Sequence, residues 1–114
     1  CSVAMFNMNA RVHDSPLDAP RNFDEYCAKV KDKFRSVVAA ARELGAKVLV
    51  CPDVGCGVFA NDPEVLGTLF GEVLRERPPR PDALTEVVLT GQASFAEAVQ
   101  KAAAGQKVNL TPPA

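Results

Sequence analysis

The stretch of residues 48–63 constrains this chain more than any other, because three kinds of local pattern meet in it. Residues 48–51 are a short apolar, β-branched run that is typical of a strand. Gly55 and Gly57 interrupt the apolar pattern, and the Asp-Pro pair at 62–63 is typical of a helix start. A strand, a glycine-rich loop and a helix N-terminus in this order are the layout of an anion-binding loop, where freed backbone N–H groups converge on a phosphate.

Helical and strand patterns alternate along the rest of the chain. Apolar residues recur at three- and four-residue spacing over residues 22–44, which predicts an amphipathic helix that stops at Gly45, with a charged face that is only solvated. Two further helices are expected at 63–74 and 94–104, the second opened by a capping box from Ser94 to Glu97. The expected strands are residues 2–6, 47–51 and 85–90.

This order of elements predicts the α/β fold class. Strands that alternate with long helices indicate a parallel sheet, and we expect its strands to be buried on both faces. The 114-residue length allows one domain with a modest core. We assign residues 1–105 to one α/β module and residues 106–114 to a flexible tail.

Composition favours an intracellular, cytoplasmic protein without nucleic-acid or membrane partners. The net charge is −1, so an electrostatic footprint for nucleic acid or a membrane surface is not expected. No apolar run approaches the roughly 20 residues of a membrane span, and no secretory signal is visible, although the first residue is Cys1. Without secretory signals, the four cysteines are expected to be reduced.

The cysteines do not predict a metal site. Cys51 and Cys56 are five positions apart, which is not a zinc spacing, and His13 is the only histidine. Cys56 has two interpretations: a reactive thiol, because loops rich in N–H groups lower a thiol pKa, or a small packed side chain, which we favour. We expect no metal and no cofactor.

The loop is the candidate ligand site, with the residues Gly55, Cys56, Gly57, Val58, Phe59 and Ala60. Glycine can adopt a positive φ and lets a ligand approach the backbone without a Cβ in the way. The carboxyl end of a strand is also where open α/β sheets usually bind ligands. The alternative is that the glycines serve only the turn, and Phe59 only the core.

The longer run from Gly55 to Pro63 resembles the diphosphate loop of the poly(ADP-ribose) glycohydrolase branch of macrodomains. Members of that branch carry Gly-Cys-Gly, a small residue, Phe, small residues and an Asp. Residues 37–46 and 48–50 resemble the helix and strand that precede the loop in the bacterial, microbial-type enzymes. Residues 2 to about 100 can be laid on the C-terminal half of that catalytic domain. The resemblance implies a macrodomain-like, three-layer α/β/α fold with a mainly parallel sheet, present here in part, and ADP-ribose or a similar nucleotide as ligand.

The chain also departs from this family. Val54 stands where the family usually has Trp, and Ala60 stands where a Gly often follows the Phe, which removes φ freedom. The family's glycine-rich stretch with paired acidic residues is absent, and Asp53 is a lone carboxylate that we take to be structural. We therefore expect no catalytic residues. This chain alone is expected to be inactive, and it is an ADP-ribosyl glycohydrolase only if a missing N-terminal half supplies the acids.

Three hypotheses for the function follow. The first is an ADP-ribose-binding module whose loop holds the diphosphate. The second is a degenerate scaffold that binds no nucleotide and self-associates as a homo-oligomer, because a half-sized parallel sheet leaves an open edge and apolar surface. The third, which we disfavour, is an enzyme with Cys56 as nucleophile, because no histidine lies near it in the sequence to act as a base.

Overall fold

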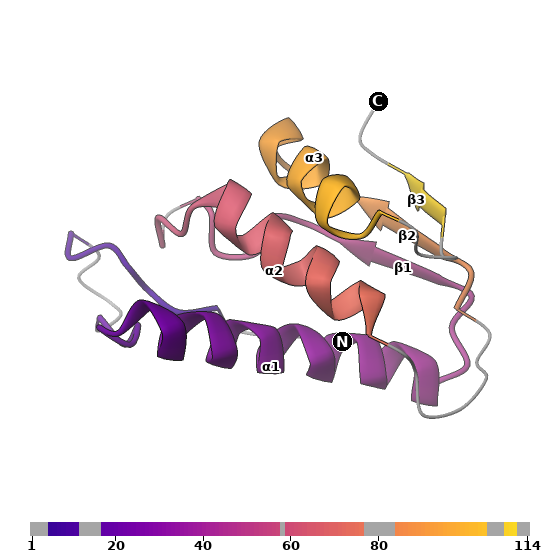
Figure 1. Ribbon diagram of the computed structural model, residues 1–114, viewed down its shortest axis with the longest axis horizontal. Coiled ribbons are helices and arrows are strands. Elements are labelled where there is room, and N and C mark those ends of the chain that lie inside the picture. The colour runs from indigo at the N-terminus through magenta and orange to yellow at the C-terminus, as the bar shows by residue number, and fades with distance from the viewer. Residues whose placement is uncertain (1–4, 12–16, 58, 77–83, 105–108, 112–114) are drawn as a thin grey trace.

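The chain folds into an α/β domain with a parallel sheet, as its alternating patterns predict. The computed structural model describes residues 5–11, 17–57, 59–76, 84–104 and 109–111. The elements, in chain order, are α1 (Phe23–Glu43), β1 (Val48–Cys51), α2 (Pro63–Arg75), β2 (Glu86–Leu89), α3 (Ala93–Ala102) and β3 (Asn109–Thr111). The strands pair in the order β1-β2-β3, and both pairs are parallel (Figure 1).

The ends of the first two helices follow from their capping residues. The Asn22 side chain accepts a hydrogen bond from the Glu25 N–H at 3.0 Å and so opens α1. Gly45, with φ of 71°, ends it, as predicted. Asp62 caps α2 by accepting from the Glu64 N–H at 2.9 Å, and Pro63 is the first helical residue. The predicted stop of α1 and start of α2 are confirmed.

The start of α3 differs from the expected capping box. The helix begins at Ala93, its N-cap is Gln92, and no side chain of the helix caps it, so the capping box from Ser94 to Glu97 is wrong. The Asp53 carboxylate accepts a hydrogen bond from the Gln92 N–H at 3.1 Å. A carboxylate from the end of another strand therefore satisfies this helix start, which no local pattern reveals.

The two ends of the chain also differ from expectation. Residues 2–4 of the expected first strand lie outside the described residues, and residues 5–9 are not in a strand, although Met5 is buried. Part of the segment expected to be a flexible tail is instead β3, because Asn109–Thr111 pairs with β2. A third parallel strand gives the backbone of β2 partners on both sides.

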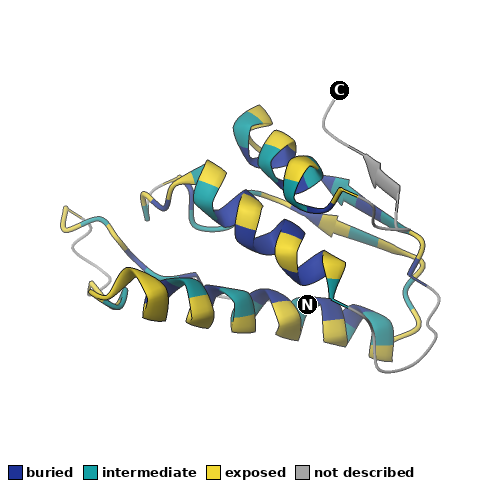
Figure 2. Cartoon of the chain, viewed as in Figure 1, coloured by how far each residue is buried: buried dark blue, intermediate teal, exposed yellow. Residues whose placement is uncertain are grey.

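Helices cover one face of the described sheet. Figure 1 shows α2 and α3 side by side in front of the strands, with α1 on the far side of α2 from α3. Leu89 and Val87 of β2 are fully buried beneath them, whereas Val48 and Val50 of β1 are 48% and 59% exposed (Figure 2). The expectation that the strands are buried on both faces is thus wrong for β1. The described part of the chain has two layers.

The core lies between the three helices and the sheet. The rings of Phe34 and Phe70 have centroids 4.8 Å apart, and those of Phe70 and Phe95 are 6.4 Å apart, so one aromatic row links α1, α2 and α3. Gly67 and Gly71 lie where α2 meets α3: a Cβ at Gly67 would stand 2.5 Å from the Phe95 carbonyl oxygen. Two glycines four residues apart therefore allow α2 and α3 to pack at close range.

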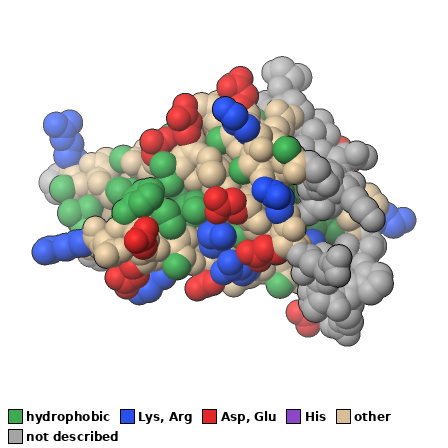
Figure 3. Space-filling model, in the orientation of Figure 1, with side chains coloured by type: hydrophobic (Ala, Val, Ile, Leu, Met, Phe, Trp, Pro, Cys, Tyr) green, Lys and Arg blue, Asp and Glu red, His purple; other side chains and the backbone are tan. Residues whose placement is uncertain are grey.

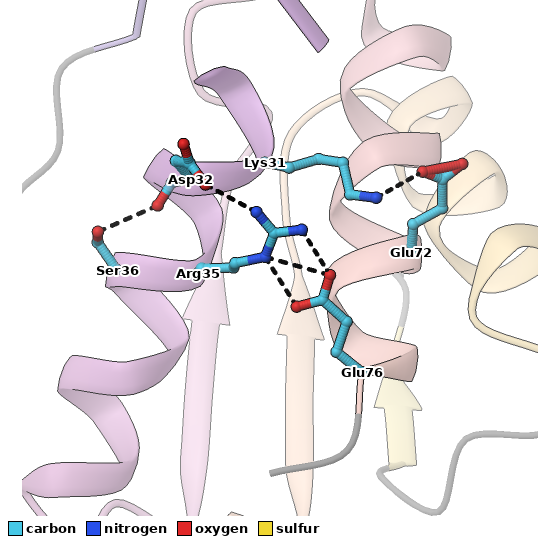
Figure 4. A network of polar contacts seen from close by, with 6 residues as sticks. All are labelled: Lys31, Asp32, Arg35, Ser36, Glu72 and Glu76. Carbon is cyan, nitrogen blue, oxygen red and sulfur yellow. Dashed lines mark hydrogen bonds and ion pairs between the residues drawn. The ribbon is translucent and has the colours of Figure 1, made fainter. Parts of the chain in front are cut away.

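The charged face of α1 is not merely solvated. Arg35 donates to the Glu76 carboxylate of α2 at 2.7–3.1 Å and is also bound by Asp32, while Lys31 lies 3.3 Å from Glu72 (Figure 4). The hydrogen bonds from Arg35 hold the pKa of Glu76 below its usual range. These pairs are partly exposed, so each contributes little to stability, and they join α1 to α2 and to its C-cap Glu76.

Candidate functional site

The glycine-rich loop lies at the carboxyl end of β1, as the sequence predicts, and is a succession of tight turns. The Cys56 N–H donates to the Asp53 carbonyl at 3.1 Å, and the Ala60 N–H donates to the Gly57 carbonyl at 3.0 Å. The Asn61 N–H closes the loop by donating to the Gly55 carbonyl at 3.0 Å. These bonds bring the two ends of the loop together just before α2 begins.

The two glycines of the loop have different roles. Gly55 has φ of 77°, and a Cβ there would stand 2.7 Å from the Met5 side chain, so this glycine serves the fold. Gly57 has no positive φ, and a Cβ there would meet nothing within 4 Å. Of the two glycines, Gly57 is therefore the one at which an added side chain would meet open space and could stand in the way of an approaching molecule.

Ala60 occupies a conformation that suits glycine. Its φ is 60°, and Ala60 is the one non-glycine residue with a positive φ among the described residues. For an L-residue this left-handed conformation costs roughly 1–2 kcal/mol. Glycine adopts this φ without that cost, so the backbone at position 60 suits glycine better than alanine.

We expect Ala60→Gly to stabilise the protein by up to about 1 kcal/mol, because relief of the strained φ outweighs the larger backbone entropy that glycine loses on folding. Urea unfolding, followed by circular dichroism, measures this. Gly45→Ala is the matched reverse change, since Gly45 has φ of 71° and open space around it, and it should destabilise by a similar amount. A loss of stability in Ala60→Gly would contradict the strain argument.

The hydrogen bonds of the loop use its carbonyl and N–H groups at alternate positions: the N–H groups of Cys56 and Ala60 donate, and the carbonyls of the residues between and beside them accept. The carbonyls of Gly55, Gly57 and Phe59 all accept bonds from the protein, the last from the Met8 N–H at 2.9 Å. Within the described residues, the N–H groups of the same three positions donate no hydrogen bond. The three N–H groups that donate no bond within the described residues can offer donors to an anion.

Asn61 holds the loop to two other segments. It is 2% exposed, and its side-chain N–H₂ donates to the Gly55 carbonyl at 2.8 Å and to the Phe6 carbonyl at 2.7 Å. Its side-chain oxygen accepts from the hydroxyl of Tyr26, on α1. One buried amide thus joins the loop, the N-terminal segment and α1, with its donors and its acceptor all used.

Tyr26 lies in a buried aromatic environment beside this amide. Its ring centroid is 6.2 Å from that of Phe6 and 6.2 Å from that of Phe23. Burial, with a smaller contribution from the nearby Cys56, raises the pKa of Tyr26 to about 12. The hydroxyl therefore stays protonated at neutral pH and acts as a donor to Asn61.

Cys56 is a packed side chain. It is buried, its Sγ lies 3.9 Å from the Val54 carbonyl oxygen, and burial together with Asp53 raises its pKa to about 11. A thiol with this pKa is almost entirely protonated at neutral pH, so it is a poor nucleophile. Among the described residues, no group of three or more Cys, Asp, Glu or His side chains could hold a metal ion. His13 lies outside the described residues.

Asp53 has a structural role, as expected. Besides accepting from Gln92, its carboxylate lies against Gly91, where a Cβ would stand 2.1 Å from Oδ1. Gly91 has φ of 90°, so both its conformation and its lack of a side chain admit the carboxylate. The aspartate therefore joins the end of β1 to the start of α3.

The remaining predicted site residues are less well defined. Phe59 is half-buried, and its carbonyl ties the loop to the N-terminal segment, while Val58 lies outside the described residues. Figure 3 shows hydrophobic side chains gathered at the end of this face where the loop and the first turns of α1 and α2 lie.

Sequence reasoning missed two residues of this site. Asn61 lies directly before the predicted helix start at 62–63, and Tyr26 lies within the predicted helix of residues 22–44, so the sequence predicts no role of its own for either. Asn61 is a polar residue between the loop and the helix cap. The cap itself is Asp62, so the local sequence gives Asn61 no role. Nothing in the sequence pairs it with Tyr26, 35 positions away.

No protein-family model matches the chain, and no curated protein matches it. None of the helices in the described segments is long and apolar enough to cross a membrane.

Proposed function

We propose that the chain is a binding module for ADP-ribose or a related nucleotide diphosphate, with the diphosphate held by the loop from Gly55 to Ala60. The observation that carries the proposal is the set of free N–H groups at three positions of this loop. The carbonyls of Gly55, Gly57 and Phe59 are satisfied by the protein, and their N–H groups are free within the described residues. Free N–H donors beside a helix start are what a phosphate needs.

Two further observations support the loop as the binding element. Gly57 is exposed, with open space where its side chain would be, so a ligand can reach the backbone there. The loop also lies at the carboxyl end of a parallel strand, where α/β proteins bind their ligands. We further propose that the domain is part of a macrodomain-like, three-layer fold, of which the described residues form a sheet and one helical layer.

The module is proposed to bind without catalysis. Glycosidic hydrolysis needs a carboxylate poised beside the scissile bond. The carboxylate that follows β1, Asp53, is engaged by the Gln92 N–H and packed on Gly91. The other carboxylate beside the loop, Asp62, caps α2. Neither is offered to a substrate, so the loop supplies affinity alone.

We expect isothermal titration calorimetry to detect binding of ADP-ribose to the protein, with much weaker binding of adenosine, which has no phosphate. Gly57→Val should abolish the binding, because a branched side chain would stand where the diphosphate approaches the backbone. The fold should be kept, since a Cβ at this position meets nothing within 4 Å. The matched control is Thr68→Val, an exposed position on α2, which should bind normally.

Two results would contradict this function. One is the absence of any heat at millimolar ADP-ribose with protein that circular dichroism shows to be folded. The other is normal binding by Gly57→Val, which would mean that ADP-ribose binds at some other place.

A self-associating scaffold is the second candidate function, and one observation favours it. Val48 and Val50 of β1 are exposed on the sheet face opposite the helices, and β1 is an edge strand of the described sheet. Parallel sheets are almost always covered on both faces. A second copy of the chain, packed through this face by a two-fold axis, would cover both valines at once.

We expect sedimentation equilibrium to distinguish this candidate. If the open face pairs two copies, the wild-type protein is a dimer at micromolar concentration, and Val50→Lys makes it monomeric by placing a charge in the contact. The matched control, Thr68→Lys on the exposed side of α2, should leave the dimer intact. A wild-type protein that stays monomeric at every concentration would exclude the candidate.

A further inference from the structure

We propose that Tyr26 and Asn61 are positioning residues for the loop, because the Tyr26 hydroxyl holds the Asn61 amide in place and that amide holds the Gly55 carbonyl inward. The inference rests on the proposed function, since it explains how the loop is kept ready for an anion. Neither residue is placed against the ligand. Their role is to decide which backbone groups of the loop face outward.

The orientation of the amide follows from its neighbours. The Tyr26 hydroxyl donates to the side-chain oxygen of Asn61, so the N–H₂ group must point the other way. There it meets two acceptors, the carbonyls of Phe6 and Gly55, at 2.7 and 2.8 Å. The reversed amide would set its oxygen against two carbonyl oxygens, so only this orientation satisfies both carbonyls, and the Tyr26 hydroxyl, which can donate or accept, donates to it.

The oriented amide determines how the loop presents itself. The Gly55 carbonyl accepts from both the backbone and the side chain of Asn61, at 3.0 and 2.8 Å. A carbonyl that is held inward by two donors cannot turn its negative oxygen toward a bound phosphate. Gly55 itself is confined by its neighbours. A Cβ there would lie 2.7 Å from the Met5 side chain and 2.9 Å from the Asn61 amide nitrogen, so the turn has little room to rearrange.

The first arm of the test measures affinity. Tyr26→Phe removes only the hydroxyl that holds the Asn61 amide, and we expect the dissociation constant for ADP-ribose to rise about tenfold in calorimetry at a temperature where the variant is fully folded. The matched control is Val30→Ala, one turn further along α1 and fully buried, which lowers stability but keeps the Tyr26 hydroxyl and its bond to Asn61. Val30→Ala should keep the wild-type affinity. Equal affinity of Tyr26→Phe and wild type would overturn the proposal.

The second arm needs no ligand. The amide N–H groups of Cys56, Ala60 and Asn61 are hydrogen-bonded within the loop, so in the wild type they should exchange slowly with deuterium. Tyr26→Phe should speed their exchange about tenfold while the amides of α3 exchange as before. Val30→Ala should not speed the exchange of the loop amides more than that of the α3 amides. Fast exchange of these amides in the wild type, or unchanged exchange in Tyr26→Phe, would overturn the positioning role.

The two arms separate this inference from the proposed function. If wild-type protein binds no ADP-ribose, the proposed function fails, and the exchange rates alone decide whether Tyr26 orders the loop. If wild-type protein binds and Tyr26→Phe binds equally well, the function stands and the positioning role is wrong.

Discussion

Gly71→Val should destabilise the protein by about 3 kcal/mol, the largest loss that we expect from a single added side chain. A Cβ at Gly71 would lie 2.6 Å from the Ala102 Cβ and 2.7 Å from the Val99 carbonyl oxygen, so α2 and α3 would have to move apart. Replacement of glycine inside a helix normally stabilises it by up to about 1 kcal/mol. A loss at this position would therefore be caused by the contact between the helices.

Chemical denaturation of Gly71→Val, with Gly57→Val as the control, would measure this effect. Gly57→Val makes the same substitution where a Cβ meets nothing within 4 Å, and its stability should stay within about 0.5 kcal/mol of wild type. Gly71→Ala should already be destabilised, because the Cβ alone makes the close contacts. If Gly71→Val and Gly57→Val were equally stable, the close packing of α2 on α3 would be disproved.

Asn61→Leu should lower the free energy of unfolding by about 3 kcal/mol or more, because it leaves buried polar groups without their partners. Leucine has a similar size but no polar atom, so the Phe6 carbonyl and the Tyr26 hydroxyl lose a hydrogen bond each. The Gly55 carbonyl keeps the bond from the backbone N–H of residue 61. The cost arises from desolvated groups and not from a cavity.

A double-mutant cycle checks that origin. Tyr26→Phe removes the hydroxyl that Asn61→Leu leaves unpaired, so the double variant should be more stable than the sum of the two single losses implies. Thermal unfolding of the four proteins gives the coupling, which we expect to be about 1 kcal/mol or more. Simple additivity would mean that the two side chains do not act on each other.

The patterns that are local in the sequence predicted much of the fold. The apolar spacing of α1, its stop at Gly45, the strand β1 and the Asp62-Pro63 start of α2 depend on neighbouring residues, and the structure has all of them. The α/β class with parallel strands followed from their alternation. The loop was also found, because a glycine-rich break between a strand and a helix is itself a local pattern.

What could not be predicted depends on contacts between distant segments. The start of α3 is held by Asp53, 39 positions earlier, so the local Ser94–Glu97 signal was misleading. Pairing with β2 made a strand of Asn109–Thr111, in a segment whose own composition indicates a tail. The roles of Gly55 and Gly57 could not be told apart either, because Met5 and Asn61, which confine Gly55, come from other parts of the chain.

The buried tyrosine of this site gives the protein an optical probe of its own. Tyr26 is the one tyrosine of the 114-residue sequence, which has no tryptophan, so tyrosine fluorescence reports on the contact between α1 and the loop alone. Far-ultraviolet circular dichroism, in contrast, reports on all the helices. Coincidence of the two signals during unfolding would show that the loop end and the α2–α3 packing belong to one cooperative unit. An earlier loss of the tyrosine signal would show that the loop end opens first.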